Sequence, residues 1–332
     1  MKAKKLMYET GLQILKATVG IRSNARDLLP KFPLQTEVKS LLTDFRDMIE
    51  IPYSAKLDGQ IVLDNGPSAA AALVWSTGKA VFRGPLRKLE GQASDLRYSL
   101  WGNQGFLYRF ILYLLEERHH IYSLHACGLY DEKRNLLYIA AGGAGSGKTV
   151  YLLSGIAKGL KLFSTETVAY ECRGKKITWF KGSLIDNVRL GTLVHDFPQF
   201  LPRLDRPSSP GHDWQKKIAL DLSSHQCSQD TLIQPDVVIL FPRIEEGRKG
   251  FLSTLFEDKR PAAKAVFDNL SQKIAETTIL YDRLTVCGLD NAGLAEARLR
   301  SACQLVENGS VVKMASVLSG PADCWGHLLE SS

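Results

Sequence analysis

The sequence predicts an α/β fold with a smaller mixed α/β region on its N-terminal side. From about residue 121 onwards, strand-like apolar runs alternate with segments whose apolar residues recur at helical spacing. A glycine-rich loop at 142–149 separates one such run from one such helical segment. Hydrophobic residues make up 45% and charged residues 23% of the 332 residues. This composition can bury a core and excludes an intrinsically disordered or low-complexity chain.

Residues 1–100 form the N-terminal region, and we place a domain boundary near residue 100. Apolar residues at helical spacing over 38–49, followed by Pro52, predict a helix. The short apolar run at 60–64 predicts a strand. The runs 72–75 and 79–83 flank a Ser-Thr-Gly turn and predict a hairpin. No residue pattern in this region points to a particular chemistry.

Residues 101–332 form the larger domain. An apolar stripe predicts a helix that begins near Phe106. The later elements share clear strand or helix periodicity. The expected strands are 123–130, 136–141, 162–163, 168–171, 177–180, 236–244 and 311–318, and the expected helices begin at Val150 or cover 261–280 and 291–307. The polar, proline-containing segment 203–217 predicts a mobile surface loop.

Composition also bounds the class of protein. No apolar run approaches the ~20 residues that a membrane-spanning helix needs. The basic start lacks the features of a secretory signal, and the six cysteines contain no CxxC pair. We therefore expect free thiols in a cytoplasmic protein. The net charge of +7 favours anionic partners such as nucleotides. No dense Arg/Lys block is present, so we do not expect nucleic-acid binding.

The glycine-rich loop carries the strongest chemical signal. Its residues satisfy G-x-x-x-x-G-K-[ST], and they are Gly142, Gly143, Ala144, Gly145, Ser146, Gly147, Lys148 and Thr149. Glycines let successive backbone N–H groups turn toward phosphate oxygens, and the following helix directs its positive end to the same point. The lysine can neutralise the outer phosphates, and the threonine hydroxyl can ligate Mg²⁺. The loop therefore predicts that ATP and Mg²⁺ are the cofactors.

Two further residues are candidates for chemistry near this loop. Glu166 follows the strand after the loop's helix, and a crossover of this kind brings strand ends to one rim of a sheet. It is a candidate metal ligand or base, and the alternative is an ordinary solvated carboxylate. His125 lies in an otherwise apolar strand, so it is either a catalytic group or a satisfied core residue. Asp236 precedes its strand and is a poor metal ligand.

These pieces together resemble the HPr kinase/phosphorylase family, whose nucleotide core is related to that of phosphoenolpyruvate carboxykinases. The resemblance rests on the order of Leu-His-Ala-Cys-Gly at 124–128, a polar turn, a strand, the phosphate loop, its helix and Thr165-Glu166. It covers about residues 121–200 and extends to 236–244. It implies a P-loop core of this type in residues 101–332, and a ring-like oligomer.

The resemblance also implies roles for single residues. His125, Lys148 and Glu166 would be catalytic, and Thr149 and Glu166 would bind the metal ion. The family has two aspartates where this chain has Thr165 and Glu166, and a threonine cannot act as a general base near neutral pH. Either Glu166 serves both functions, or another carboxylate contributes, or turnover is weak or absent.

Three further residues are candidates for this site, one for the missing carboxylate and two for phosphate contacts. Asp186 could be the second carboxylate, and Arg189 could contact phosphate, although both also suit a plain strand and turn. Arg260 is another possible phosphate contact or a surface arginine at a helix start.

The leading hypothesis is an Mg·ATP-dependent kinase that transfers the γ-phosphoryl group to a hydroxyl. The acceptor would be a serine of a protein or peptide, or a small hydroxylated metabolite. The alternative is a non-catalytic nucleotide-binding regulatory protein, because Thr165 breaks the acidic pair. A P-loop ATPase or nucleic-acid motor is a third reading, and it lacks the usual apolar strand that ends in an acidic pair.

Overall fold

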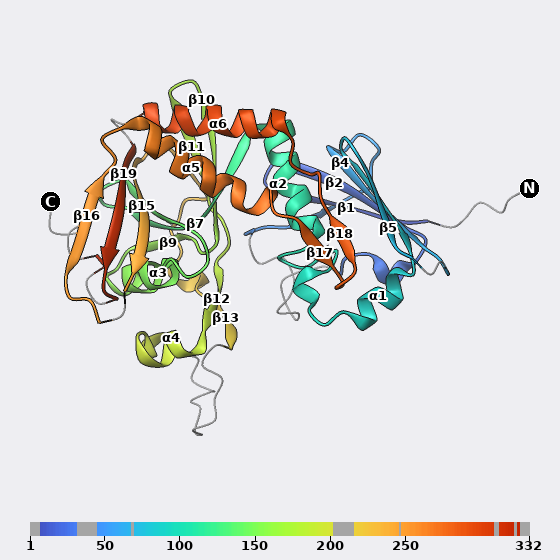
Figure 1. The fold of residues 1–332 in the computed structure, drawn as a ribbon, viewed down its shortest axis with the longest axis horizontal. Helices are drawn as coiled ribbons and strands as arrows, with labels where there is room; N and C mark the ends of the chain where they lie inside the picture. The colour runs from blue at the N-terminus through green and yellow to red at the C-terminus, as the bar shows by residue number, and fades with distance from the viewer. Residues whose placement is uncertain are drawn as a thin grey trace, which may run out of the picture. The chain divides into compact units, whose positions relative to one another are not determined.

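The fold was analysed in a computed structural model, which describes residues 7–31, 45–67, 70–201, 216–245, 247–308, 312–321 and 324–325. The chain is a mixed α/β protein with several sheets (Figure 1). It divides into two compact units. The first contains residues 1–122 and 273–298, and the second contains residues 123–272 and 299–332.

A six-stranded mixed sheet is the centre of the first unit, with the strand order β3-β1-β2-β4-β6-β5. Its strands are β1 (Tyr8–Ile14), β2 (Ala17–Ser23), β3 (Ile49–Ile51), β4 (Gly59–Asn65), β5 (Ala72–Ser76) and β6 (Lys79–Gly84). The pairs β2–β4 and β4–β6 are parallel, and the others are antiparallel. Helix α1 (Leu86–Gln92) and the small sheet β17 (Thr278–Leu280)–β18 (Leu284–Val286) complete the unit.

Helix α2 (Phe106–His119) packs against this sheet through aromatic side chains. The Trp75 ring of β5 meets the rings of Phe106 and Phe110 edge-on, with centroids 6.4 and 5.4 Å away. Phe82 of β6 meets Phe106 at 4.8 Å. Such edge-to-face contacts add to the stabilisation from burying apolar area. The apolar stripe that the sequence predicts from Phe106 onwards is therefore part of the core of the first unit.

A buried ion network lies in the same unit. Arg298 is fully buried, and its Nε donates to Glu116 Oε2 over 2.9 Å while its Nη2 pairs with Asp290. Burial raises the pKa of Glu116 to about 8, although the charge of Arg298 acts in the opposite direction. One side chain of this network thus titrates far from its ordinary range.

The second unit is built on a nine-stranded sheet in the order β14-β11-β10-β7-β8-β15-β19-β16, with β9 paired to β7. Its strands are β7 (Ile121–Asp131), β8 (Leu136–Ala141), β9 (Lys161–Ser164), β10 (Thr167–Arg173), β11 (Lys176–Phe180), β14 (Thr231–Ile233), β15 (Asp236–Ile244), β16 (Phe251–Leu255) and β19 (Val312–Ser319). Strands β8, β15 and β19 run parallel, so their carboxyl ends share one edge.

Helices and a short hairpin complete this unit, and the last of these helices begins in the first unit. They are α3 (Lys148–Ala157), α4 (Leu190–His195), α5 (Lys259–Ile274), α6 (Ala292–Glu307) and the pair β12 (Ile185–Arg189)–β13 (Lys217–Asp221). Helix α3 packs in an apolar cluster that includes Tyr138 of β8, Leu240 of β15, Val188 of β12 and Trp325. Trp325 Nε1 donates to the Tyr151 carbonyl over 2.9 Å. This cluster fixes α3, and with it the loop that precedes α3, on the sheet.

Most elements agree with the sequence analysis, and two do not. The hairpin of β5 and β6 and the strands β7, β8 and β15 lie where the periodicity predicts them. The helix predicted over 38–49 is wrong at its end, because residues 45–48 are irregular and Ile49 begins β3; residues 38–44 lie outside the described residues. The helix predicted over 261–280 ends at Ile274, because 278–280 pair with β18.

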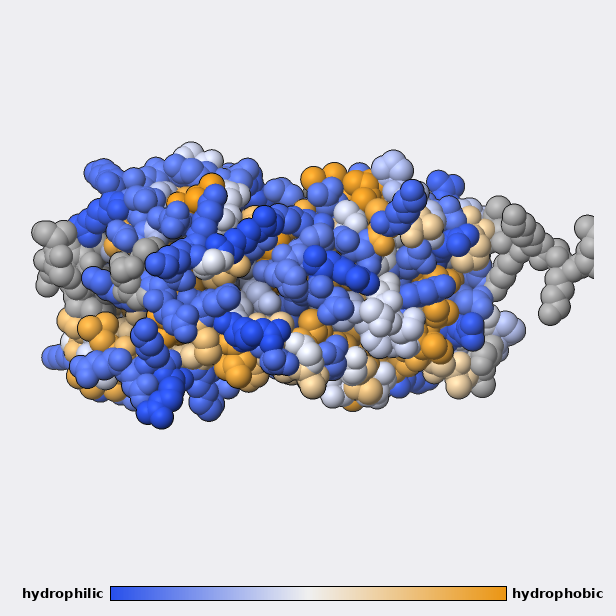
Figure 2. Space-filling model, turned by 90° about the horizontal axis from the view of Figure 1, so that it is seen from above, coloured by the Kyte–Doolittle hydropathy of each residue, from blue (hydrophilic) through white to orange (hydrophobic). Residues whose placement is uncertain are grey.

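Three further findings concern the sequence expectations. The predicted loop 203–217 lies outside the described residues except for its last two positions. All six cysteines are free thiols. No helix among the described residues has the length and apolar character to cross a bilayer. Figure 2 shows one face of the molecule, on which hydrophilic residues predominate and hydrophobic residues form small groups.

Candidate functional site

The glycine-rich loop joins the end of β8 to the start of α3, as its sequence predicts. Gly147 adopts φ +99°, and a Cβ atom at this position would lie 2.2 Å from Ile244 Cγ1 at the end of β15. A residue with a side chain would be both strained and blocked there. The backbone of the loop therefore rests directly on the carboxyl end of β15. Ala144 and Gly145 form the exposed tip of the loop.

Lys148 is the first residue of α3, and its side chain folds back over the loop. Its Nζ donates to the carbonyls of Gly142 and Gly143 over 2.7 and 2.9 Å. The Oγ atom of Ser146 is buried and has no hydrogen-bond partner among the described residues. A buried hydroxyl without a partner is costly in a folded protein and suits a site that receives a polar ligand. The positive end of α3 lies at the same place.

His125 lies beside the first residue of the loop. Its carbonyl accepts the Gly142 N–H over 3.2 Å. Asn269 of α5 brackets its backbone, because Asn269 Oδ1 accepts the His125 N–H over 2.9 Å and Asn269 Nδ2 donates to the His125 carbonyl over 3.2 Å. These bonds hold the β7 strand, the loop and the end of α5 together.

The His125 ring is also oriented. His125 Nδ1 lies 3.0 Å from Gln272 Oε1, and an amide oxygen only accepts, so Nδ1 carries the proton. The lone pair of the neutral ring is then on Nε2, which lies 3.8 Å from Glu166 Oε2.

Sequence reasoning did not single out Asn269 and Gln272. Their spacing of three residues puts them on one face of a helix. The sequence spacing shows that the two residues share a helix face. It does not show that this face contacts His125. The contact depends on how α5 packs in the folded chain.

Thr165 occupies a structural position in the turn between β9 and β10. Its side chain is buried, its Oγ1 donates to the Ile185 carbonyl over 2.8 Å, and its N–H donates to the Ser183 carbonyl over 2.9 Å. Thr165 thus attaches this turn to the start of β12. Its neighbour Glu166 has a half-buried side chain that faces His125.

Asp186 comes to the same place from β12. Asp186 is 3% exposed. Buried and partly buried residues alternate along β12, so Asp186 and Val188 lie on the same inner face of the strand. The Thr149 hydroxyl and the Glu166 carboxyl both lie beside its carboxyl group. Burial, and then the neighbouring Glu166 carboxyl, raise the pKa of Asp186 well above its ordinary value. Its Oδ2 atom has no hydrogen-bond partner among the described residues.

The two arginine candidates lie at exposed positions. Arg189 ends β12 and pairs in register with Lys217. The Arg260 side chain is 92% exposed, and its Nη2 pairs with Asp258 Oδ2 over 3.0 Å. The structure therefore brings together His125, Lys148, Thr149, Glu166 and Asp186, and it assigns Arg260 to a surface ion pair.

The oxygen atoms at this site fit a magnesium ion. Thr149, Glu166 and Asp186 provide one hydroxyl and two carboxyl groups, and Asp186 Oδ2 is a buried oxygen without a partner. Within the described ranges no group of three His, Cys, Asp or Glu side chains is arranged to hold a metal ion. Mg²⁺ does not need such a group, because it takes one or two carboxylates and completes its shell with water and substrate phosphates.

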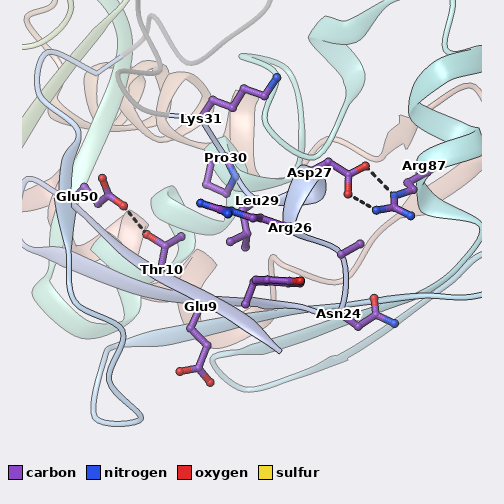
Figure 3. Close-up of a pocket in the computed structure, with 12 residues that line it drawn as sticks. Glu9, Thr10, Asn24, Arg26, Asp27, Leu29, Pro30, Lys31, Glu50 and Arg87 are labelled. Carbon is purple, nitrogen blue, oxygen red and sulfur yellow. Dashed lines mark hydrogen bonds and ion pairs between the residues drawn. The ribbon is translucent and has the colours of Figure 1, made fainter. Parts of the chain in front are cut away.

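A hollow of about 940 Å³ lies in the first unit, away from the glycine-rich loop in the sequence (Figure 3). Two pairs of its lining side chains interact with each other. Arg87 pairs with Asp27, with its Nε donating to Asp27 Oδ2 over 2.7 Å, and the Thr10 hydroxyl donates to Glu50 Oε1 over 3.0 Å. Figure 3 shows these two pairs on opposite sides of the hollow. Arg26 and Lys31 also line the hollow, and neither side chain has an ion-pair partner among the described residues. No residue pattern there points to a particular chemistry.

Comparisons with known proteins add no identification. No protein-family model matches the chain, and no curated protein sequence matches it significantly.

Proposed function

We propose that the chain is an Mg·ATP-dependent kinase with a P-loop core of the HPr-kinase and phosphoenolpyruvate-carboxykinase type, acting in the cytoplasm on a hydroxyl acceptor. The acceptor is a serine of a protein or peptide, or a small hydroxylated metabolite. The observation that carries the proposal is the carboxyl pair of the buried Asp186 and the half-buried Glu166, which lies beside Thr149 of the glycine-rich loop.

The binding half of the proposal uses the loop. Its amides, the N-terminus of α3 and the Ser146 hydroxyl would hold phosphate oxygens. Lys148 would exchange its bonds to the Gly142 and Gly143 carbonyls for bonds to the outer phosphates. Thr149, Glu166 and Asp186 would hold Mg²⁺, which supplies charge neutralisation between the phosphates when bound.

The chemical half concerns the proton of the acceptor hydroxyl. As the hydroxyl oxygen forms its bond to the γ-phosphorus, the bond from that phosphorus to the bridging oxygen of ADP breaks, and the hydroxyl proton must leave. Glu166 takes this proton. The Nε2 atom of His125, at 3.8 Å from Glu166 Oε2, can share it. Catalysis otherwise consists of positioning and neutralisation of charge.

The test is calorimetric titration with ATP in the presence and absence of Mg²⁺, followed by transfer of labelled γ-phosphate to the components of a cell extract. We expect Mg²⁺-dependent binding and a labelled acceptor. Lys148→Met should abolish both, whereas Lys158→Met, at an exposed position at the end of α3, should change neither. Equal ATP affinity of Lys148→Met and wild type would show that the loop assignment is wrong.

The same experiment separates the kinase from the regulatory alternative. Mg²⁺-dependent binding with no labelled acceptor would favour a nucleotide-binding regulatory protein. Glu166→Gln should bind nucleotide in a folded protein and lose transfer. Full transfer by a folded Glu166→Gln variant would remove Glu166 from the proposed mechanism.

A further inference from the structure

Helix α5 directs two polar side chains to His125, and they differ in which of their atoms remain unused. Asn269 uses both its oxygen and its nitrogen, because Oδ1 accepts the His125 N–H and Nδ2 donates to the His125 carbonyl. Gln272 uses its oxygen alone, which accepts from His125 Nδ1 over 3.0 Å. A carboxamide nitrogen carries two N–H donors. Those of Gln272 have no hydrogen-bond partner among the described residues.

The unused donors of Gln272 lie beside the glycine-rich loop. A Cβ atom added to Gly143 would lie 3.6 Å from Gln272 Nε2, which is ordinary van der Waals contact. Rotation of the carboxamide would break its bond to His125, so the nitrogen stays on the side of the loop. The side chain is half-buried and therefore only partly solvated.

Lys148 reaches the same part of the loop from α3. Its Nζ donates to the carbonyls of Gly142 and Gly143. The lysine of such a loop contacts the outer phosphates of a bound nucleotide. An ammonium group and a carboxamide nitrogen, which come from two different helices, thus lie beside Gly143. Both can donate hydrogen bonds to an anionic group at this end of the loop.

We propose that Gln272 is a specificity-determining residue for the triphosphate, because its Nε2 donates to an oxygen of the γ-phosphate. This inference rests on the proposed function, since it requires that the loop binds ATP. A hydrogen bond to a phosphate oxygen is charge-assisted and therefore stronger than one between neutral groups. ADP lacks the γ-phosphate, so the contact with Gln272 contributes to the affinity for ATP alone.

Calorimetric titration of the full chain with Mg·ATP and with Mg·ADP tests this preference. In Gln272→Leu, the affinity for Mg·ATP should fall about 10–100-fold, the usual effect of losing a hydrogen bond to a charged group. The affinity for Mg·ADP should keep its wild-type value. The matched control is Gln304→Leu, because Gln304 is an exposed glutamine of helix α6 in the same unit. This control should keep both affinities.

A second variant, Gln272→Glu, separates contact with the phosphate from support of His125. A glutamate keeps an oxygen that can accept from His125 Nδ1, but an ionised carboxylate has no N–H donor. Gln272→Glu should therefore lose the preference for ATP, as Gln272→Leu does. A Gln272→Glu protein with the wild-type ratio of ATP to ADP affinity would show that Gln272 acts through His125 alone, and it would overturn the inference.

The inference and the proposed function fail in different ways. A wild-type chain that binds neither nucleotide would overturn both. A wild-type chain that binds both nucleotides, with an unchanged ratio of affinities in Gln272→Leu, would overturn the inference and leave the loop assignment in place. Thermal unfolding without nucleotide shows whether each variant is folded. If Gln272→Leu does not fold, Gln272→Glu decides, because its side chain has the shape of the wild-type one.

Discussion

The carboxyl group of Asp186 lies beside that of Glu166, although β12 carries the first and the turn between β9 and β10 carries the second. Thr165 holds these two segments together by donating its hydroxyl hydrogen to the Ile185 carbonyl. The residue that interrupts an acidic pair in the sequence therefore helps to position a carboxyl group from another strand. Among the alternatives that the sequence left open, this geometry supports a second carboxylate from elsewhere in the chain.

Asp186→Asn should lower the affinity for Mg·ATP about 10–100-fold, a typical loss when one group that supports a metal site is removed. Affinity for ATP without Mg²⁺ should change little, because the loop amides and Lys148 do not depend on Asp186. Calorimetric titration with and without Mg²⁺ measures both affinities. The control is Asp221→Asn on β13, which is exposed and pairs in register with Ile185. Equal Mg²⁺ dependence in Asp186→Asn and wild type would exclude Asp186 from the metal site.

Thr165→Asp should lose stability and should not gain transfer activity. The position is 2% exposed, and a third carboxyl group would lie in the same buried region as Asp186 and Glu166. Thr165→Val removes one hydrogen bond and should cost about 0.5–1.5 kcal/mol, because the Ile185 carbonyl loses the Thr165 hydroxyl and keeps the Ser183 hydroxyl as a donor over 3.1 Å. Urea unfolding measures both changes. A stable Thr165→Asp protein with increased phosphoryl transfer would instead mean that the wild-type chain lacks a catalytic group.

Gly147→Ala should destabilise the chain and abolish nucleotide binding, since the new methyl group would meet Ile244 within 2.2 Å. Gly159→Ala provides a matched control, because Gly159 also has a positive φ, +93°, but nothing lies within 4 Å of the added Cβ. The control should therefore lose only about 1 kcal/mol from backbone strain. Thermal unfolding and ATP titration of both variants separate the steric contact from the strain. Equal losses in the two variants would contradict the close packing of the loop on β15.

The stability of the first unit should fall as the pH rises from about 4.5 to about 8. The pKa of Glu116 is raised to about 8 from an ordinary value of 4.5, so the folded chain keeps a proton that the unfolded chain releases. Stability from this proton is complete below pH 4.5 and is lost as the pH passes the folded value, by at most about 1.4 kcal/mol per pH unit.

Glu116→Gln, which cannot titrate, should flatten this pH dependence. Urea unfolding at a series of pH values provides the measurement. The exposed neighbour Glu117 gives the control variant Glu117→Gln, which should keep the wild-type slope. If Glu116→Gln also kept the wild-type slope, another group would be responsible for it.

Local pattern predicted the strand β8, the loop and the helix α3, because their apolar spacing and glycines act within one short segment. The same reasoning could not find the contact between Asp186 and Glu166, which depends on how β12 packs beside α3. It also missed the hairpin of β1 and β2, whose glycines interrupt the apolar alternation. The helix predicted over 38–49 is an error of the opposite kind, because the apolar spacing assigns a strand residue to a helix. Ile49 has helical spacing with its neighbours but pairs with Gln13 of β1 instead.

The two carbonyls that receive Lys148 have a consequence for recognition. A free lysine side chain has about 2 kcal/mol of rotamer entropy to lose when a ligand fixes it. Here the ammonium group is already held over the loop by Gly142 and Gly143. That ordering is completed when the chain folds, so an incoming phosphate meets a side chain with few conformations left. The side chain then has only to exchange one set of oxygen acceptors for another. Affinity at this position should therefore depend on the difference in strength between carbonyl and phosphate oxygens as acceptors.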